Sequence, residues 1–70
     1  MIRKPVSSSN LKSVGYEEET QILEIEFNNG GVYRYFEVPK TVYFELMSAS
    51  SHGKYFNQYI KNCYHWSQVC

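Results

Sequence analysis

The clearest pattern in the chain is a strict alternation of apolar and polar residues near its middle. Leucine, isoleucine and phenylalanine alternate with two glutamates through residues 21–27, with the period of two expected of a strand that buries one face. The next segment, Asn-Asn-Gly-Gly at residues 28–31, is a turn signal because both residue types tolerate the positive φ that hairpins need. Together with shorter candidates at 11–16 and 32–38, the pattern predicts a three-stranded antiparallel meander.

The register of the second hairpin decides which way Tyr33 and Tyr35 point. A two-residue turn would place Arg34 on the apolar face, whereas a three-residue loop with Gly31 in a left-handed bulge turns both tyrosines toward that face. Because a buried, unpaired arginine is very costly, we predict the bulged register. The predicted pairs are Phe27–Tyr33, Glu26–Arg34 and Ile25–Tyr35.

After Val38 and Pro39 the apolar spacing becomes helical. Proline suits the first position of a helix, and residues 40–49 carry apolar side chains on one side. Residues 52–62 place them at i, i+1, i+4, i+5 and i+8, as expected of a helix with one buried face. The order β-β-β-α-α predicts an α+β fold, a three-stranded antiparallel β-meander followed by two α-helices packed on one face.

The length of the chain allows one small core. A chain of 70 residues buries only about 60% of the surface that its unfolded form exposes. We therefore expect a single domain over residues 1–70, with a core at 6–62 and flexible ends at 1–5 and 64–70. Aromatic residues make up 17% of the chain, so their rings either fill this core or stay outside it to stack on a ligand.

The formal net charge is zero, which disfavours a strongly basic nucleic-acid binder. The charge is unevenly spread, with +3 in residues 1–16, −5 in residues 17–26 and +2 in residues 27–70, so an anion-binding surface should come from the ends and the second half. No apolar run reaches the roughly 18 residues that span a bilayer. Because the first residues also lack the apolar stretch of a signal peptide, we expect a cytoplasmic protein without a membrane partner.

The cysteines and histidines form no recognisable metal or catalytic pattern. Cys63 and Cys70, even with His52 and His65, lack the close pairs typical of zinc sites. Cys63 instead falls on the apolar stripe of the second predicted helix, and Cys70 is predicted to be a free thiol. Neither histidine has a nucleophile and an acid placed to form a triad, and the glutamates of the central strand fit an exposed polar face. We expect no catalytic residues, no metal and no cofactor.

The start of the second predicted helix is a candidate anion site. Residues 50–54, Ser-Ser-His-Gly-Lys, would present free backbone N–H groups and the positive end of the helix dipole to a phosphate. Lys54 adds a charge there, and Lys61 follows two turns later on the same side. Aromatic rings nearby can stack on a base, with about 1–3 kcal/mol for each. The same residues also fit an ordinary serine cap beside a solvated lysine, and Tyr33 and Tyr35 also fit half-buried positions in a sheet.

Six short segments occur in a characteristic order. They are Val6–Leu11, Ser13–Tyr16, Leu23–Phe27, Gly31–Tyr35, Val38–Pro39 and Ser50–Asn57. In this order, across residues 6–62, they resemble the KTSC domain, which is named after the C-terminal extension of some lysyl-tRNA synthetases. Members of that family occur fused to this synthetase and as short free-standing bacterial and phage proteins. The resemblance therefore implies a single-domain protein, with RNA binding suggested by the synthetase context.

Two motifs of the family imply functional residues here. The central motif supplies Tyr33 and Tyr35, and the helix-start motif supplies Ser51, Gly53, Lys54, Tyr55 and Asn57. The tail departs from the basic, tyrosine-rich ending of many relatives, because residues 62–68 hold no fixed cation, and binding of long RNA rests mostly on neutralising several phosphates. The predicted ligand-binding residues are Tyr33, Arg34, Tyr35, Ser50, Ser51, His52, Gly53, Lys54, Tyr55, Asn57 and Lys61.

Three functions fit these residues. The first is a non-catalytic RNA-binding module that uses the helix start and the aromatic rings. The second is a receptor for a small nucleotide, such as a sequestered signal, whose one or two phosphates suit a neutral chain better than a polynucleotide does. The third is a protein-interaction adaptor that docks through the apolar residues of the tail. Small size and these tail residues also favour a homo-oligomer.

Overall fold

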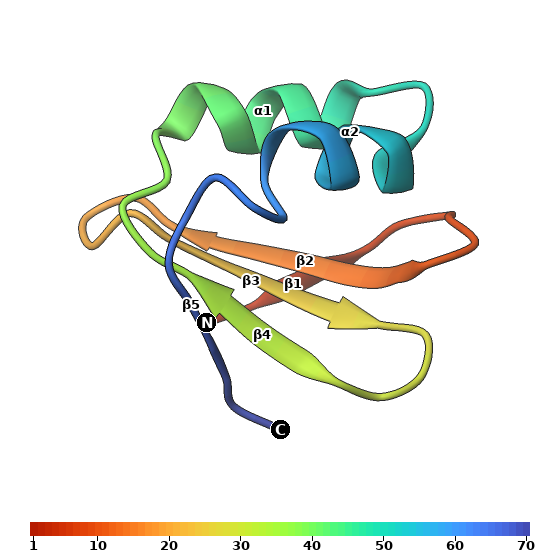
Figure 1. Ribbon diagram of the computed structural model, residues 1–70, viewed down its shortest axis with the longest axis horizontal. Coiled ribbons are helices and arrows are strands. Elements are labelled where there is room, and N and C mark those ends of the chain that lie inside the picture. The colour runs from red at the N-terminus through yellow and green to blue at the C-terminus, as the bar shows by residue number, and fades with distance from the viewer.

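The computed structural model describes all 70 residues as one antiparallel sheet with both helices on the same face (Figure 1). The elements are β1 (Arg3–Pro5), β2 (Leu11–Glu17), β3 (Ile22–Phe27), β4 (Val32–Tyr35), α1 (Lys40–Ser48), α2 (His52–Tyr59) and β5 (Trp66–Gln68). The strands lie side by side in chain order, and the two helices are inserted between β4 and β5. The opposite face of the sheet carries no helix (Figure 1).

The predicted α+β fold with an antiparallel sheet and two helices is confirmed, but the prediction of three strands is wrong. The sheet has five strands, because both end segments join it as short edge strands. In β1, Lys4 pairs with Val14 of β2, and in β5, Ser67 pairs with Arg34 of β4. A three-residue strand shows almost no periodicity, so the sequence pattern could not reveal either edge.

The hairpin between β3 and β4 keeps the predicted faces but not the predicted pairs. Ile25 lies opposite Tyr33 and Glu24 opposite Arg34, a shift of two residues from the prediction. The left-handed residue is Gly30, with φ +93°, rather than Gly31. Because side chains alternate with a period of two, a shift of two residues leaves each one on its predicted face. Both tyrosines of β4 therefore face the helices, and the arginine meets a glutamate.

We expect Gly30→Ala to lower the free energy of unfolding by about 1 kcal/mol, because a positive φ disfavours residues with a Cβ. No atom lies within 4 Å of the position that this Cβ would occupy, so the loss comes from backbone strain alone. Urea denaturation measures it. Gly30→Asn should lose less, since asparagine tolerates positive φ, and equal losses for the two variants would contradict this explanation.

One apolar core fills the space between the sheet and the helices. It consists of Leu11, Val14, Leu23, Ile25, Tyr35, Val38, Leu46, Phe56 and Ile60. The alternation in β3 supplies Leu23 and Ile25, as the period of two predicts. Since α2 ends at Tyr59, Cys63 lies beyond the helix and is exposed, like Cys70. The prediction that Cys63 packs in the core is therefore wrong.

Glu24 is buried on the open face of the sheet, where an exposed carboxylate was predicted. It is only 4% exposed, accepts a hydrogen bond from Arg34 Nε at 2.8 Å and forms an ion pair with Arg3. Burial by itself would raise the pKa of Glu24, but the hydrogen bonds and charges of Arg34 and Arg3 outweigh it and lower the pKa below its ordinary value of 4.5. This carboxylate ties the edge strand β1 and the strand β4 to the centre of the sheet.

Candidate functional site

The main candidate site is a cavity of about 410 Å³ on the helix side of the sheet. It lies where α2 and the segment after it face the ends of β3, β4 and β5. Ten residues line it: Asn10, Phe27, Asn29, Tyr33, Tyr35, Phe56, Asn57, Lys61, Asn62 and Trp66. We call this cavity the groove. Its volume lies within the range of about 300–1,000 Å³ that is typical of ligand pockets.

The five aromatic residues of the groove form one continuous chain of rings. Trp66 contacts Tyr33 edge to face with ring centroids 5.4 Å apart, Tyr33 contacts Phe27 at 5.5 Å, and Phe27 contacts Phe56 at 5.3 Å. The chain ends at Tyr35, 5.5 Å from Phe56. Edge-to-face packing of this kind holds each ring in place. Trp66 remains 55% exposed, so part of its indole is available to a planar ligand.

The polar lining of the groove is made of side-chain amides and one cation. It holds four asparagines and Lys61, and no carboxylate. The side chains of Asn57, Lys61 and Asn62 are exposed and make no hydrogen bond or ion pair within the protein. Asparagine amides donate and accept hydrogen bonds, and lysine only donates. This lining suits a ligand that combines a flat ring, hydrogen-bonding edges and a negative charge.

Tyr35 is nearly buried at the groove, yet its hydroxyl has no partner in the protein. The residue is only 4% exposed. No fully buried side-chain nitrogen or oxygen lacks a partner, so the Tyr35 hydroxyl keeps some exposed surface, and Tyr35 lines the groove. Burial, with a smaller effect of Tyr33, raises the pKa of Tyr35 to about 12. At neutral pH this hydroxyl is therefore protonated and able to donate a hydrogen bond.

The start of α2, which was predicted to be an open anion site, is partly capped and packed by the protein itself. Ser51 caps the helix by accepting a hydrogen bond from the backbone N–H of Lys54 at 3.2 Å. His52 Nδ1 donates to the carbonyl oxygen of Leu46 at 2.8 Å. Gly53 is buried against the loop before β2, where a Cβ would lie 3.6 Å from side-chain atoms of both Ser8 and Asn10. The helix start serves the fold in this structure, and the loop covers it.

Four of the predicted site residues meet in the groove: Tyr33, Tyr35, Asn57 and Lys61. Arg34 lies on the opposite face with Glu24. Tyr55 donates to Glu45 at 2.6 Å, and burial together with this bond raises its pKa to about 12. Ser50 and Lys54 are exposed and do not line the groove. The central motif and the end of α2 are thus brought together, and the helix-start motif is mostly separate from them.

Sequence reasoning missed six of the residues that line the groove. They are Asn10, Phe27, Asn29, Phe56, Asn62 and Trp66. The two phenylalanines were correctly predicted to be on apolar faces, and the three asparagines fall in segments predicted to be a polar lead-in, a turn and the end of the second helix. Trp66 lies in a tail without periodicity, and only its pairing opposite Tyr35 in β5 brings it to the groove. The one signal in the sequence that could have indicated these residues is the single tryptophan, which follows Lys61 and Asn62 within five residues.

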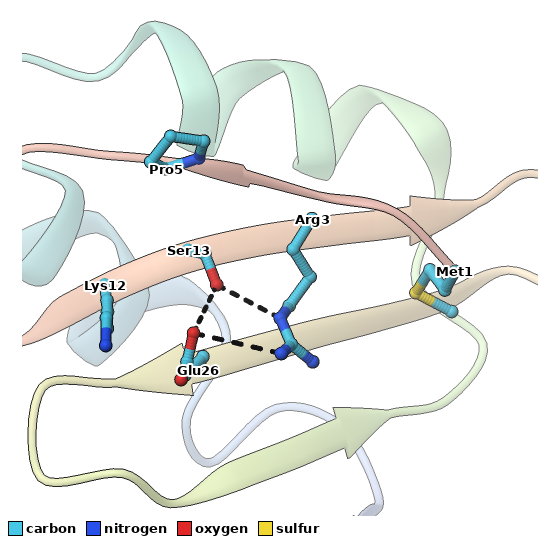
Figure 2. A pocket seen from close by; sticks show the side chains of 6 residues that line it. All are labelled: Met1, Arg3, Pro5, Lys12, Ser13 and Glu26. Atoms are coloured by element: carbon cyan, nitrogen blue, oxygen red, sulfur yellow. Dashed lines mark hydrogen bonds and ion pairs between the residues drawn. The ribbon is translucent and has the colours of Figure 1, made fainter.

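A second cavity, of about 400 Å³, lies on the helix-free face (Figure 2). Arg3 reaches across it, and its Nε donates to Ser13 Oγ at 3.1 Å. Arg3 Nη2 lies 3.8 Å from Glu26 Oε1. Arg3 Nη1 forms the ion pair with Glu24. The donors of Arg3 are thus engaged within the protein, and this cavity offers a ligand little beyond Lys12.

No three His, Cys, Asp or Glu side chains are grouped in a way that could hold a metal ion. None of the helices has the length and apolar character needed to cross a membrane.

Comparisons with known proteins agree with the resemblance seen in the sequence. The chain is 49% identical over 61 residues to an uncharacterized protein of Stutzerimonas stutzeri, an alignment that covers 87% of this chain and 86% of that protein. It is 44% identical over 61 residues to a lysine–tRNA ligase of Nostoc punctiforme, covering 87% of this chain but only 11% of the ligase. These relatives are bacterial.

The fold also matches a solved structure. A crystal structure of a KTSC domain protein from Yersinia pestis superposes with a TM-score of 0.96 at 38% identity, covering 99% of this chain and 97% of that chain. The sequence pattern of the KTSC domain matches residues 7–64. This match includes all nine core residues and all but one of the groove residues, since only Trp66 lies outside it. The chain therefore belongs to the KTSC domain family.

Proposed function

We propose that this protein is a non-catalytic RNA-binding module that holds single-stranded RNA in the groove. The observation that carries the proposal is the chain of five packed rings beside the amides of Asn57 and Asn62 and Lys61, three side chains that make no hydrogen bond within the protein. Unstacked RNA bases are recognised by stacking on aromatic side chains and by hydrogen bonds to their edges. The similarity to lysine–tRNA ligases, enzymes named for a tRNA substrate, supports RNA as the ligand class.

The charges of the protein support the same choice of surface. The negative segment 17–26 places Glu24 and Glu26 on the helix-free face, where Arg3 pairs with both of them. The groove holds no carboxylate that would repel a phosphate, and Lys61 supplies its only positive charge. Affinity should therefore come mainly from stacking and hydrogen bonding, with a modest electrostatic contribution.

The positions of the two histidines support a binding role over a catalytic one. His52 bonds to a backbone carbonyl oxygen, and neither it nor His65 lines the groove. No side chain there is thus suited to act as a general base at neutral pH. In this proposal the protein binds its RNA in the cytoplasm and does not change it chemically.

Lys61→Gln should weaken binding of single-stranded RNA about fivefold to tenfold at low salt, because it removes one charge-assisted contact to a phosphate. Fluorescence anisotropy of a labelled oligonucleotide measures the dissociation constant. Lys54→Gln is the matched control, since it makes the same charge change near the start of α2 but outside the groove, and it should change the constant less than twofold. Equal losses for both variants, or a larger loss for Lys54→Gln, would place the site at the helix start instead.

A further inference from the structure

Among the groove residues whose side-chain polar groups have no partner in the protein, Tyr35 is the most buried. Two half-buried tyrosines have partners, since Tyr16 donates to the carbonyl oxygen of Val38 at 2.6 Å and Tyr55 donates to Glu45, whereas Tyr33, Tyr43 and Tyr64 are half-buried without one. No fully buried side-chain oxygen lacks a partner, so the Tyr35 hydroxyl keeps a small contact with solvent although its residue is only 4% exposed. A ligand in the groove that Tyr35 lines would offer this free donor an acceptor.

The dimensions of the groove limit how much of an RNA strand it can hold. Its volume of about 410 Å³ lies near the lower end of the range for ligand pockets. Grooves that follow a longer single strand combine several stacking platforms with a positively charged path. Here one exposed indole and one lysine line the cavity, which is enough for one base and one phosphate.

We infer that the groove reads a single nucleotide, whose base contacts Trp66 and accepts a hydrogen bond from the Tyr35 hydroxyl while Lys61 faces its phosphate. This inference rests on the proposed function, because it names the unit of RNA that the groove recognises. Within a longer strand the groove would hold one base, and the neighbouring nucleotides would lie outside it.

The first test removes only the hydroxyl. Tyr35→Phe should weaken binding of single-stranded RNA about tenfold, the effect of one hydrogen bond to a group that is then left unpaired. Its melting temperature should stay the same or rise, because the hydroxyl has no partner in the free protein. The control is Tyr43→Phe, which removes a hydroxyl that makes no hydrogen bond and lies outside the groove. Unchanged affinity of Tyr35→Phe, or a loss matched by Tyr43→Phe, would overturn the role of Tyr35.

The second test uses the unaltered protein and 5′-phosphorylated oligonucleotides of increasing length, from the mononucleotide to the octanucleotide. Corrected for the number of bases offered, the affinity should change less than threefold along the series. The logarithm of the binding constant should fall with the logarithm of salt concentration with a slope of about −0.7, the value for one phosphate contact in a single strand.

The outcomes separate this inference from the proposed function. An affinity that rises more than tenfold with length, or a slope that corresponds to several phosphates, would overturn the single-nucleotide groove but leave RNA binding in place. Absence of binding at every length and at low salt would contradict the proposed function itself. Binding of the mononucleotide alone would support the inference and make a free nucleotide, rather than an RNA strand, the ligand.

Discussion

Replacing Trp66 with alanine is expected to weaken binding of single-stranded RNA by about tenfold to a hundredfold. Stacking of one base on an aromatic ring contributes about 1–3 kcal/mol, and about 1.4 kcal/mol corresponds to a factor of ten in affinity. Trp66 is the most exposed ring of the groove, at 55%, and is therefore the ring best placed to contact a base. Fluorescence anisotropy with a labelled oligonucleotide measures the change.

A matched control separates this loss from a general effect of removing an exposed ring. Phe44 in α1 is 56% exposed and does not line the groove, so Phe44→Ala should leave the affinity within about twofold. The thermal unfolding of Trp66→Ala must also be recorded, because Trp66 packs against Tyr33. A Trp66→Ala variant that folds and binds RNA as tightly as the unaltered protein would contradict the proposed role of the groove.

The second large effect is expected on stability. Glu24→Gln should lower the free energy of unfolding by about 2 kcal/mol, because it removes the charge that two arginines share on the open face. Breaking a buried ion pair costs about 3–5 kcal/mol, and the loss is smaller here because both guanidinium groups reach solvent. The control is Glu18→Gln, which breaks an exposed pair with Lys40 and should cost no more than about 0.5 kcal/mol.

The effect of Glu24 should also depend on pH. The pKa of Glu24 is lower in the folded protein than the ordinary value of 4.5. The charge of Glu24 therefore stabilises the fold fully above pH 4.5, and this stabilisation is lost as the pH falls through the folded pKa. The difference in unfolding free energy between the unaltered protein and Glu24→Gln should thus be constant near neutrality and shrink below pH 4.5. A difference that grows on acidification would contradict the assigned ion pairs.

Periodicity predicted the centre of this fold and failed at its edges. The alternation around Leu23 and Ile25 and the helical spacing after Pro39 are long enough to define a strand and a helix without structural data. The strands β1 and β5 are three residues each, and pairing with a formed neighbour rather than their own pattern holds them in place. The loop of the β3–β4 hairpin was misjudged because two successive glycines can each supply the left-handed residue, and the choice of Gly30 depends on contacts across the sheet.

The candidate site was only partly predictable for a related reason. Tyr33 and Tyr35 point to the helix side because of the alternation in β4, which the sequence contains. The approach of Trp66 depends on β5 returning to the edge of the sheet, a long-range pairing that composition and spacing do not encode. The helix start looked open in the sequence because its cover, the loop containing Ser8 and Asn10, lies more than 40 residues earlier in the chain.

The fluorescence of Trp66 offers the most direct test of the groove as the RNA site. It is the only tryptophan of the chain, so an emission change reports on this position alone, and a base stacked on an indole quenches its emission. Titration with unlabelled single-stranded RNA should quench the emission in a saturable way, with the same dissociation constant as anisotropy gives for a labelled strand. RNA that binds by anisotropy but leaves the Trp66 emission unchanged would show that it binds elsewhere on the protein.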